Sequence, residues 1–314
     1  MHRGRRAGIL PEKSEQGIPD MKIAAAAYPL DFHEDFFSFA AKTRAWVDRA
    51  AAADADLLVF PEYGLMEQAS LGGRKLANDL EASLHEVARH RPATDALLAE
   101  LAREHGLHIL GPSGPVFDTA FSPDRPVNRA TLFGPTGLIG HQDKQMMTRF
   151  ERETWDVVAG GPLQVFDTDI GRIGVLICYD SEFPLLGRAL IEAGAEIILV
   201  PSCTDSLAGF TRVRTGAMAR ALEGQCLTVH APTVGDCDFC LAVDENVGRA
   251  AIYGPSDRGF PDTGILAETA LNAPGWAIAE TSLEAVHAVR RSGNVFNHAH
   301  WPEQAMRARS LNRR

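Results

Sequence analysis

Short runs of apolar and β-branched residues alternate along this chain with segments in which apolar residues recur at helical spacing. A short apolar run bounded by Gly or Pro is typical of a buried strand, and apolar residues at every third or fourth position are typical of a helix. The strands predicted in this way are 22–28, 55–60, 107–110, 129–133, 138–141, 164–168, 172–178, 196–200, 226–230, 249–253 and 276–280. The predicted helices are 32–53, 92–105, 185–193, 210–223 and 283–289.

The order of these elements predicts the fold class. Strands alternate with helices, as in an α/β protein, but two hairpin patterns, at 129–141 and 164–178, interrupt the alternation. We therefore expect a mixed sheet arrangement, with two sheets sandwiched between helices. We expect one domain over 21–290, preceded by a mobile tail at 1–20 that is rich in charge, Gly and Pro, and followed by a polar tail at 291–314.

Charge and composition exclude several classes of partner. The 314 residues carry a formal net charge of −10 and form no basic stripe, so we expect no nucleic-acid partner. No apolar run approaches the roughly 18 residues that span a membrane, and no apolar segment of a secretory signal precedes Pro11. An odd number of cysteines, five, without an export signal favours reduced thiols in the cytoplasm.

Cys237 and Cys240 have the spacing of a redox pair or of half a zinc site. No second pair of this kind accompanies them, and no histidine pair at helical spacing stands nearby, so we favour a loop without such a role. His287, His298 and His300 resemble a solvated tail rather than a metal site. We therefore expect no metal and no cofactor.

The run Gly174–Ile177 leads directly into Cys178, at a junction between a predicted strand and a predicted helix. The first backbone N–H groups of a helix have no partner within the helix, and they stabilise a thiolate or an oxyanion near them. This position suits a nucleophile. The alternative is that Cys178 is a small buried hydrophobic residue, as many free cysteines are.

Two further polar residues follow apolar runs in the same way. Glu62 comes directly after the strand 55–60 and Pro61, and Lys144 follows the hairpin at 129–141. Because ligand sites gather at the carboxyl ends of strands, Glu62 is a candidate general base. Lys144 is a candidate stabiliser of the thiolate and of an oxyanion, with the Tyr179 N–H as a second donor. The alternative is a Glu62–Lys144 salt bridge beside an inert cysteine; three such residues at strand ends favour the catalytic hypothesis.

Three segments carry a family resemblance, namely VFPEYG (59–64), HQDKQMMTRFERE (141–153) and GVLICYDSEFP (174–184). In order and spacing they resemble the signature segments of the nitrilase superfamily of carbon–nitrogen hydrolases, and the similarity extends over about 21–290. The resemblance implies a four-layer α-β-β-α sandwich and a Glu-Lys-Cys triad. It also implies a covalent thioester, no metal, and face-to-face pairing of subunits into a homodimer or larger homo-oligomer.

The resemblance also implies a second glutamate between the lysine and cysteine segments. We assign that role to Glu153, seven positions before Gly160, and expect it to orient Lys144. Glu151 is the alternative, and we favour for it a solvated charge on a helix face.

The sequence Cys178-Tyr179-Asp180 resembles amidases and carbamoyl hydrolases more than true nitrilases, and 145–153 resembles a little-characterised bacterial branch. We expect hydrolysis of a non-peptide C–N bond in a small amide or carbamoyl compound, with release of ammonia or an amine. Nitrilase activity, acyl transfer by the same cysteine and a non-catalytic binding homologue remain alternatives. The candidate substrate-binding residues follow the same strand ends: Tyr63, Tyr179, Asp180, Glu182, Ser202 and Thr204.

Each of these has a structural alternative, such as packing for Tyr63 and helix capping for Ser202 and Thr204. Arginines at 212, 214 and 220 could bind a substrate carboxylate, but we expect them to pair at the surface or at a subunit interface.

Overall fold

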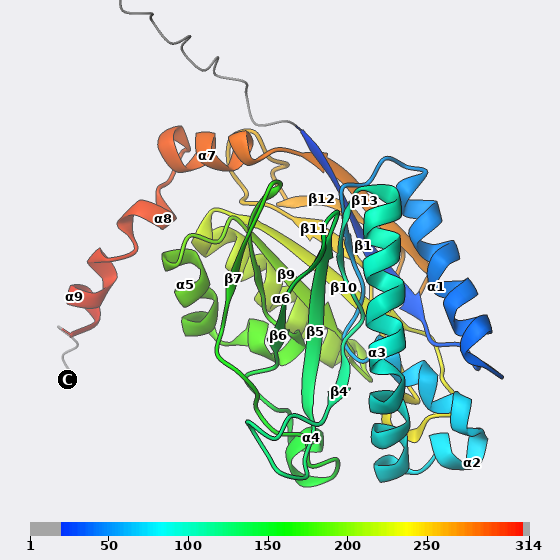
Figure 1. Ribbon diagram of the computed structural model, residues 1–314. Coiled ribbons are helices and arrows are strands. Elements are labelled where there is room, and N and C mark those ends of the chain that lie inside the picture. Colours follow the sequence, from blue (N-terminus) through cyan, green and yellow to red (C-terminus); the bar gives the residue numbers. More distant parts are fainter. Residues whose placement is uncertain (1–19, 310–314) are drawn as a thin grey trace, which may run out of the picture.

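The computed structural model describes residues 20–309, so 19 of the 20 residues of the predicted N-terminal tail lie outside the described part of the chain. The strands are β1 Met21–Pro29, β2 Leu57–Val59, β3 His108–Leu110, β4 Gly114–Val116, β5 Val127–Gly134, β6 Gly137–Asp143, β7 Val165–Thr168, β8 Gly171–Val175, β9 Ile197–Ser202, β10 Leu227–Val234, β11 Ala251–Tyr253, β12 Ile265–Glu268 and β13 Gly275–Thr281. The α-helices are α1 Phe36–Ala51, α2 Arg74–Ala77, α3 Leu80–His105, α4 Arg149–Glu153, α5 Pro184–Glu192, α6 Leu207–Gly224, α7 Leu283–Ser292, α8 Asn297–His300 and α9 Glu303–Arg309, and the 3-10 helices are η1 Gly64–Gly72, η2 Cys178–Glu182 and η3 Leu241–Val243 (Figure 1).

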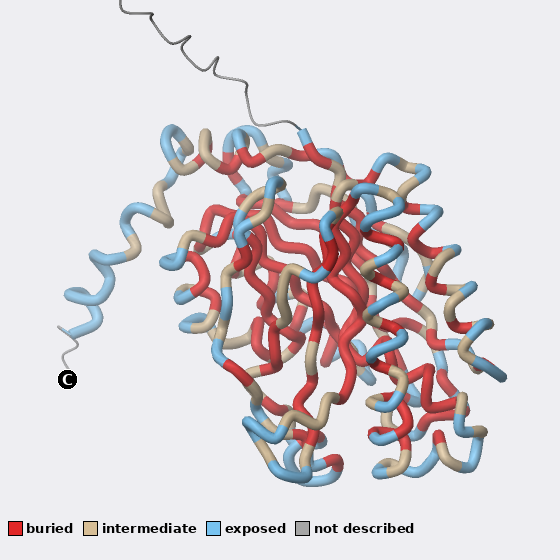
Figure 2. The backbone as a smooth tube through the Cα atoms, in the orientation of Figure 1, coloured by how far each residue is buried: buried red, intermediate tan, exposed pale blue. Residues whose placement is uncertain are grey.

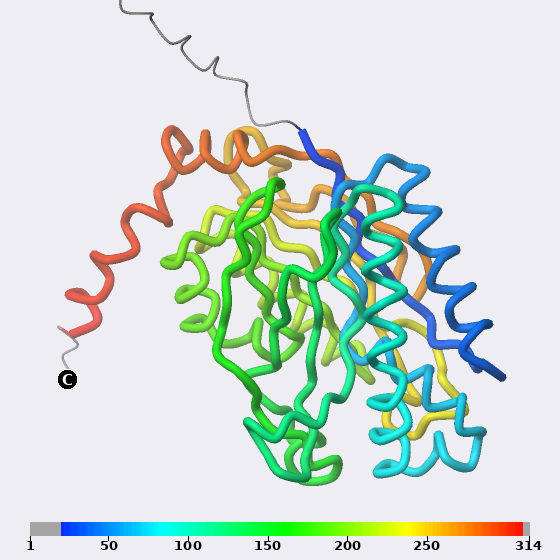
Figure 3. The backbone as a smooth tube through the Cα atoms, in the orientation of Figure 1, coloured from blue at the N-terminus to red at the C-terminus, as the bar shows by residue number. Residues whose placement is uncertain are grey.

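The strands join into one 13-stranded mixed sheet, which confirms the predicted α/β class. Its central order is β4-β5-β3-β2-β1-β10-β9-β8-β7. The link between β1 and β10 consists of two residue pairs, Tyr28 with Thr233 and Pro29 with Val234. β1 instead makes seven pairs with β13, which comes from the far end of the chain, and Figure 3 shows the two running side by side. The sheet is therefore continuous, but its two halves are connected only by the short pairing between β1 and β10.

The alternation of side chains along β1 divides the core in two. Ile23, Ala25 and Ala27 pack into a cluster with the apolar residues of β8, β9 and β10. Ala24, Ala26 and Tyr28 point to the other face and pack with residues of α1 and α3. Successive side chains of a strand face opposite sides, so each face of β1 meets a separate apolar layer. Figure 2 shows the buried residues concentrated in the strands, with the outer faces of the helices exposed.

Helix boundaries follow side-chain caps. Asp79 caps α3 by accepting hydrogen bonds from the backbone N–H groups of Glu81 and Ala82, and Gly106 ends the helix with a φ of 68°. The prediction that this helix starts at Pro92 is wrong, because α3 begins twelve residues earlier and runs through the proline. Proline removes one internal hydrogen bond from a helix, but the cap at Asp79 and the apolar residues on both sides of Pro92 outweigh that loss.

The predicted C-terminal tail contains two short helices, α8 and α9, as far as residue 309. No residue of α9 is buried, and Figure 1 shows it projecting away from the rest of the molecule. Within residues 20–309, none of the helices is both long enough and apolar enough to cross a membrane.

Candidate active site

Seven strands run in the same direction and end at one edge of the sheet, and four of them lead into residues of the site. β3, β2, β1, β10, β9 and β8 are parallel neighbours. β6 shares their direction, because β3 pairs antiparallel with β5 and β5 pairs antiparallel with β6. Glu62 follows β2, Lys144 follows β6, Cys178 follows β8 and Cys203 follows β9. The topology therefore brings to one edge four residues that are up to 141 positions apart in the chain.

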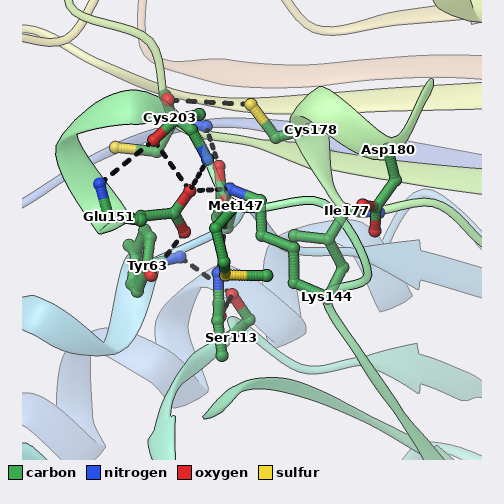
Figure 4. Close-up of polar contacts among 12 residues, drawn as sticks. Tyr63, Ser113, Lys144, Met147, Glu151, Ile177, Cys178, Asp180 and Cys203 are labelled. Atoms are coloured by element: carbon green, nitrogen blue, oxygen red, sulfur yellow. Dashed lines mark hydrogen bonds and ion pairs between the residues drawn. The ribbon is translucent and has the colours of Figure 1, made fainter. Parts of the chain in front are cut away.

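Lys144 lies between two carboxylates at the centre of this edge. Its Nζ atom is 2.7 Å from Oε1 of Glu62 and 2.6 Å from Oε2 of Glu151, and all three side chains are almost fully buried (Figure 4). The two carboxylates raise the pKa of Lys144 well above its ordinary value, although burial acts in the opposite direction. Lys144 therefore carries a fixed positive charge in a site of low dielectric constant.

Glu62 is held by three donors. Oε1 accepts hydrogen bonds from Lys144 and, at 3.0 Å, from Nδ2 of Asn128, while Oε2 accepts one from the backbone N–H of Cys203 at 2.9 Å. Burial is the largest cause of its raised pKa, and Lys144 counteracts it. A carboxylate with a raised pKa that is held in one orientation is suited to accept a proton and return it.

Cys178 occupies a strained turn. It begins η2 with a φ of 52°, a left-handed conformation that is costly for a residue with a side chain. Its Sγ atom lies 3.8 Å from the carbonyl oxygen of Cys203, and only 3% of the residue is exposed. Burial and the charge of Glu62 raise its pKa well above the ordinary value, so the resting group is a thiol that needs a base when it attacks.

These residues lie at a cavity of about 390 Å³, a size suited to a small molecule. Its lining includes the three predicted triad residues together with Glu151 and Cys203. Four of the six predicted substrate-binding residues also line it: Tyr63, Tyr179, Glu182 and Thr204. Tyr63 donates its hydroxyl hydrogen to Oε1 of Glu151 at 2.7 Å, which connects the cavity wall to the charged cluster.

Glu153 does not contact Lys144, and its predicted role is wrong. Its side chain is 59% exposed and pairs with Arg149 at 2.7 Å. Glu151 is buried instead, and the alternative of a solvated charge for it is also wrong. Thr148 caps α4 with its side chain and Glu151 reaches back to the Thr148 N–H at 2.8 Å, so the start of the helix turns Glu151 inward.

Asp180 and Ser202 do not line the cavity, contrary to the prediction. Asp180 is fully buried and its carboxylate accepts hydrogen bonds from backbone N–H groups on two segments. Ser202 is fully buried within β9, where its hydroxyl lies 2.8 Å from Nε2 of His230. Strand-end position predicts proximity to the edge, but the direction in which a side chain points decides what it contacts.

Sequence reasoning missed two residues that orient Glu62 and Tyr63, namely Asn128 and Ser113. Asn128 stands on β5 and contacts Glu62, and Ser113 donates to Oδ1 of Asn128 at 2.7 Å while accepting from the Tyr63 N–H at 3.0 Å. Cys203, which the sequence places at a strand end beside Ser202 and Thr204, lines the cavity and contributes its backbone to the site. Asn128 could have been found from its place as a lone amide in an otherwise strand-like, largely buried run.

Within the described residues, no three His, Cys, Asp or Glu side chains are grouped to hold a metal ion. Cys237 and Cys240 are free and buried in the loop after β10. Burial raises the pKa of each to about 12, so neither is a reactive thiolate.

Comparison with known proteins agrees with this geometry. The carbon–nitrogen hydrolase family model matches residues 22–291. The probable hydrolase YhcX of Bacillus subtilis is 33% identical over 275 residues, which cover 88% of this chain and 52% of YhcX. A deaminated glutathione amidase of Yersinia enterocolitica is 36% identical over 145 residues, 43% of this chain and 50% of that protein. The chain thus spans about half the length of these two relatives.

Solved structures share the fold. The structure of Nit3 from Saccharomyces cerevisiae, a member of branch 10 of the nitrilase superfamily, superposes with a TM-score of 0.68 at 22% sequence identity. The match covers 87% of this chain and 94% of Nit3. Because the family model spans most of the chain and the fold agrees, the protein belongs to the carbon–nitrogen hydrolase family.

Proposed function

We propose that the protein hydrolyses the C–N bond of a small amide or carbamoyl compound through a thioester on Cys178. One observation carries this proposal: a buried thiol at the wall of the cavity, with a held carboxylate, Glu62, and a fixed cation, Lys144, at the same strand edge. Family membership and the amidase among the relatives support the same chemistry.

In the first half-reaction, the Cys178 Sγ attacks the amide carbonyl carbon while its proton passes to Glu62. Lys144 and the backbone N–H of Tyr179 stabilise the oxyanion that forms. The tetrahedral intermediate collapses by breaking the C–N bond, and Glu62 returns the proton to the leaving nitrogen. Ammonia or an amine departs and the acyl group remains on sulfur.

In the second half-reaction, a water molecule attacks the thioester carbonyl and gives a proton to Glu62. The same oxyanion donors act again, because the second tetrahedral intermediate has its oxygen in the same place. Breaking the C–S bond releases a carboxylic acid, and Cys178 recovers its proton from Glu62. Glu151 holds the Lys144 ammonium throughout, which keeps the cation directed at the reacting carbonyl.

An acyltransferase or a nitrilase would use the same cysteine, and product analysis separates them from an amidase. Purified protein would be incubated with matched amides, carbamoyl amines and nitriles, with and without added amine or thiol acceptors. We expect ammonia and free acid from an amide or carbamoyl compound. Release of ammonia from nitriles alone would contradict the proposal. Formation of the acylated acceptor in place of free acid, at low acceptor concentration, would also contradict it.

We further propose that the curled sheet supplies the inner two layers of a four-layer α-β-β-α sandwich. The support is the division of β1 between two apolar clusters, one of them shared with α1 and α3. We also propose pairing into a homodimer or larger assembly in the cytoplasm. Exposed apolar side chains on the outer helices support pairing: Leu185 of α5 is 79% exposed and Leu222 of α6 is 47% exposed.

The charges around the cavity favour a substrate without a negative group. Asp205, Asp244 and Glu245 line it, are exposed, and have no Lys, Arg or His partner within 4.0 Å among residues 20–309. The cationic lining residues outside the triad are both matched by carboxylates, because Arg212 lies 3.5 Å from Glu182 and Arg149 is paired as described above. The opening is therefore net negative.

We expect the value of kcat/KM to fall in the order 6-aminohexanamide, heptanamide, 6-carbamoylhexanoate. These amides share a chain length and differ only in a terminal ammonium, methyl or carboxylate group. Each step should change kcat/KM by about 3- to 10-fold at low salt, and the spread should shrink at 0.5 M salt because exposed charges are screened. Initial rates of ammonia release give kcat/KM for each amide. A higher kcat/KM for 6-carbamoylhexanoate than for the other two amides would contradict the charge argument.

A further inference from the structure

Asp180 is a buried carboxylate that the proposed chemistry does not use. It is 0% exposed and lies outside the cavity lining. Oδ1 accepts hydrogen bonds from the backbone N–H groups of Met146 at 2.7 Å and Gln145 at 3.1 Å. Oδ2 accepts from Ile177 at 3.1 Å and from Gln145 at 3.2 Å. Among residues 20–309, these backbone amides are the only hydrogen-bond donors to its carboxylate.

The donors flank two residues of the proposed triad. Gln145 and Met146 directly follow Lys144, and Ile177 directly precedes Cys178. The segment between β6 and α4 has no strand or helix of its own, so its backbone N–H groups need partners from elsewhere. Figure 4 shows Asp180 beside Ile177, on the other side of Lys144 from Glu151.

Asp180 also closes the strained turn at Cys178. Its own N–H donates to the carbonyl oxygen of Ile177 at 3.1 Å, while its carboxylate accepts from the Ile177 N–H. Ser181 adds a hydrogen bond from its hydroxyl to the Cys178 carbonyl at 2.7 Å. A left-handed residue persists only when its surroundings hold it, and these contacts supply that restraint.

We propose that Asp180 is a positioning residue that fixes the Lys144 segment and the Cys178 turn relative to each other. This inference rests on the proposed function of Lys144 and Cys178. One side chain joins the backbone that follows Lys144 to the backbone that precedes Cys178. Loss of these hydrogen bonds displaces the Lys144 ammonium from the Cys178 sulfur. The cavity wall stays in place, because Asp180 does not line it.

Asp180→Asn is the sharpest variant, because it keeps the shape and removes one acceptor. The Oδ1 atom accepts a hydrogen bond from the Met146 N–H, and the Oδ2 atom accepts one from the Ile177 N–H. An amide NH₂ in either place would direct a donor at a backbone donor, so one of the two segments is released. Asp180→Glu keeps both acceptor oxygens and serves as the conservative variant.

The experiment measures alkylation of Cys178 by iodoacetamide, with peptide mapping to separate it from Cys203, together with kcat and KM for amide hydrolysis. We expect Asp180→Asn to slow alkylation and to lower kcat by about 10- to 100-fold, with KM within 3-fold of the wild type. The alkylation rate and kcat of Asp180→Glu should lie between those of the wild type and those of Asp180→Asn. Asp167→Asn, on the exposed face of β7 and away from the cavity, is the matched control and should behave as wild type.

Alkylation of Asp180→Asn within 3-fold of the wild-type rate would overturn the inference. Failure of Asp180→Asn to fold by circular dichroism would also overturn it, because Asp180 would then act on the fold as a whole and not on the site. The alkylation measurement needs no amide turnover. A wild-type protein that hydrolyses no amide but shows the alkylation difference would therefore contradict the proposed function and leave the positioning role intact.

Discussion

Replacing Cys178 with alanine is expected to lower the rate of amide hydrolysis by about 10⁴-fold or more, because the variant cannot form the thioester. The fold should persist. Cys178 is 3% exposed and loses one sulfur atom, so we expect the free energy of unfolding to change by about 1 kcal/mol or less. The strained φ of 52° is no less accessible to alanine than to cysteine.

Ammonia release and thermal unfolding, measured on the same samples, check this prediction. Cys226→Ala is the matched control, because Cys226 is also a buried free cysteine but lies outside the cavity lining. Its Sγ atom is 3.5 Å from the carbonyl oxygen of Arg220, in the packing of α6. Residual activity in Cys178→Ala above a hundredth of the wild-type rate would contradict the nucleophile assignment.

The second large effect is expected at Glu151 and not at Glu153. Glu151→Gln keeps the shape but removes the charge that lies 2.6 Å from the Lys144 Nζ atom. Lys144 then has Glu62 as its single carboxylate partner, so it moves toward Glu62 and lowers the basicity of that group. We expect kcat to fall by about 10²- to 10³-fold. The amide oxygen still accepts a hydrogen bond, so the loss of stability should be about 1–3 kcal/mol.

Glu153→Gln is the matched control for this experiment, since the two glutamates share helix α4. The pair that Glu153 makes with Arg149 is exposed and contributes about 0.2–1 kcal/mol at most. We expect kcat within 2-fold of wild type. Steady-state kinetics of the two variants side by side gives the answer, and equal losses in both would show that the charge of α4, and not the contact with Lys144, matters.

The parts of the fold that rest on local pattern could be predicted from the sequence. The strand that ends at Val59 is a continuous apolar run, the run 173–177 marks the end of β8, and the hairpins are marked by turn residues. Glu62, Lys144 and Cys178 could be placed near each other because they follow such strands. The first twelve residues of α3, before Pro92, were not predicted because their stability comes from a cap and from packing, which local propensity does not include.

The wrong assignments share one physical cause, which is the direction of a side chain within a short segment. Glu151 and Glu153 are two positions apart on a five-residue helix, so they point to different sides. The capping contact with Thr148 is what selects Glu151. Asp180 is likewise turned from the cavity by backbone donors on segments that the linear sequence does not show to be adjacent. The Asp180 contacts with Gln145 and Met146 arise only once the strand ends have met, whereas the capping pattern of Thr148 and Glu151 is local and could have been found in the sequence.

Trapping with hydroxylamine tests the thioester on Cys178 most directly. An amide and a methyl ester of the same acid would be turned over in the presence of hydroxylamine, and the ratio of hydroxamate to free acid would be measured for each. A shared acyl-enzyme predicts the same ratio from both substrates, because partitioning occurs after the leaving group has gone. A ratio that depends on the leaving group, or equal hydroxamate formation by Cys178→Ala, would contradict the account.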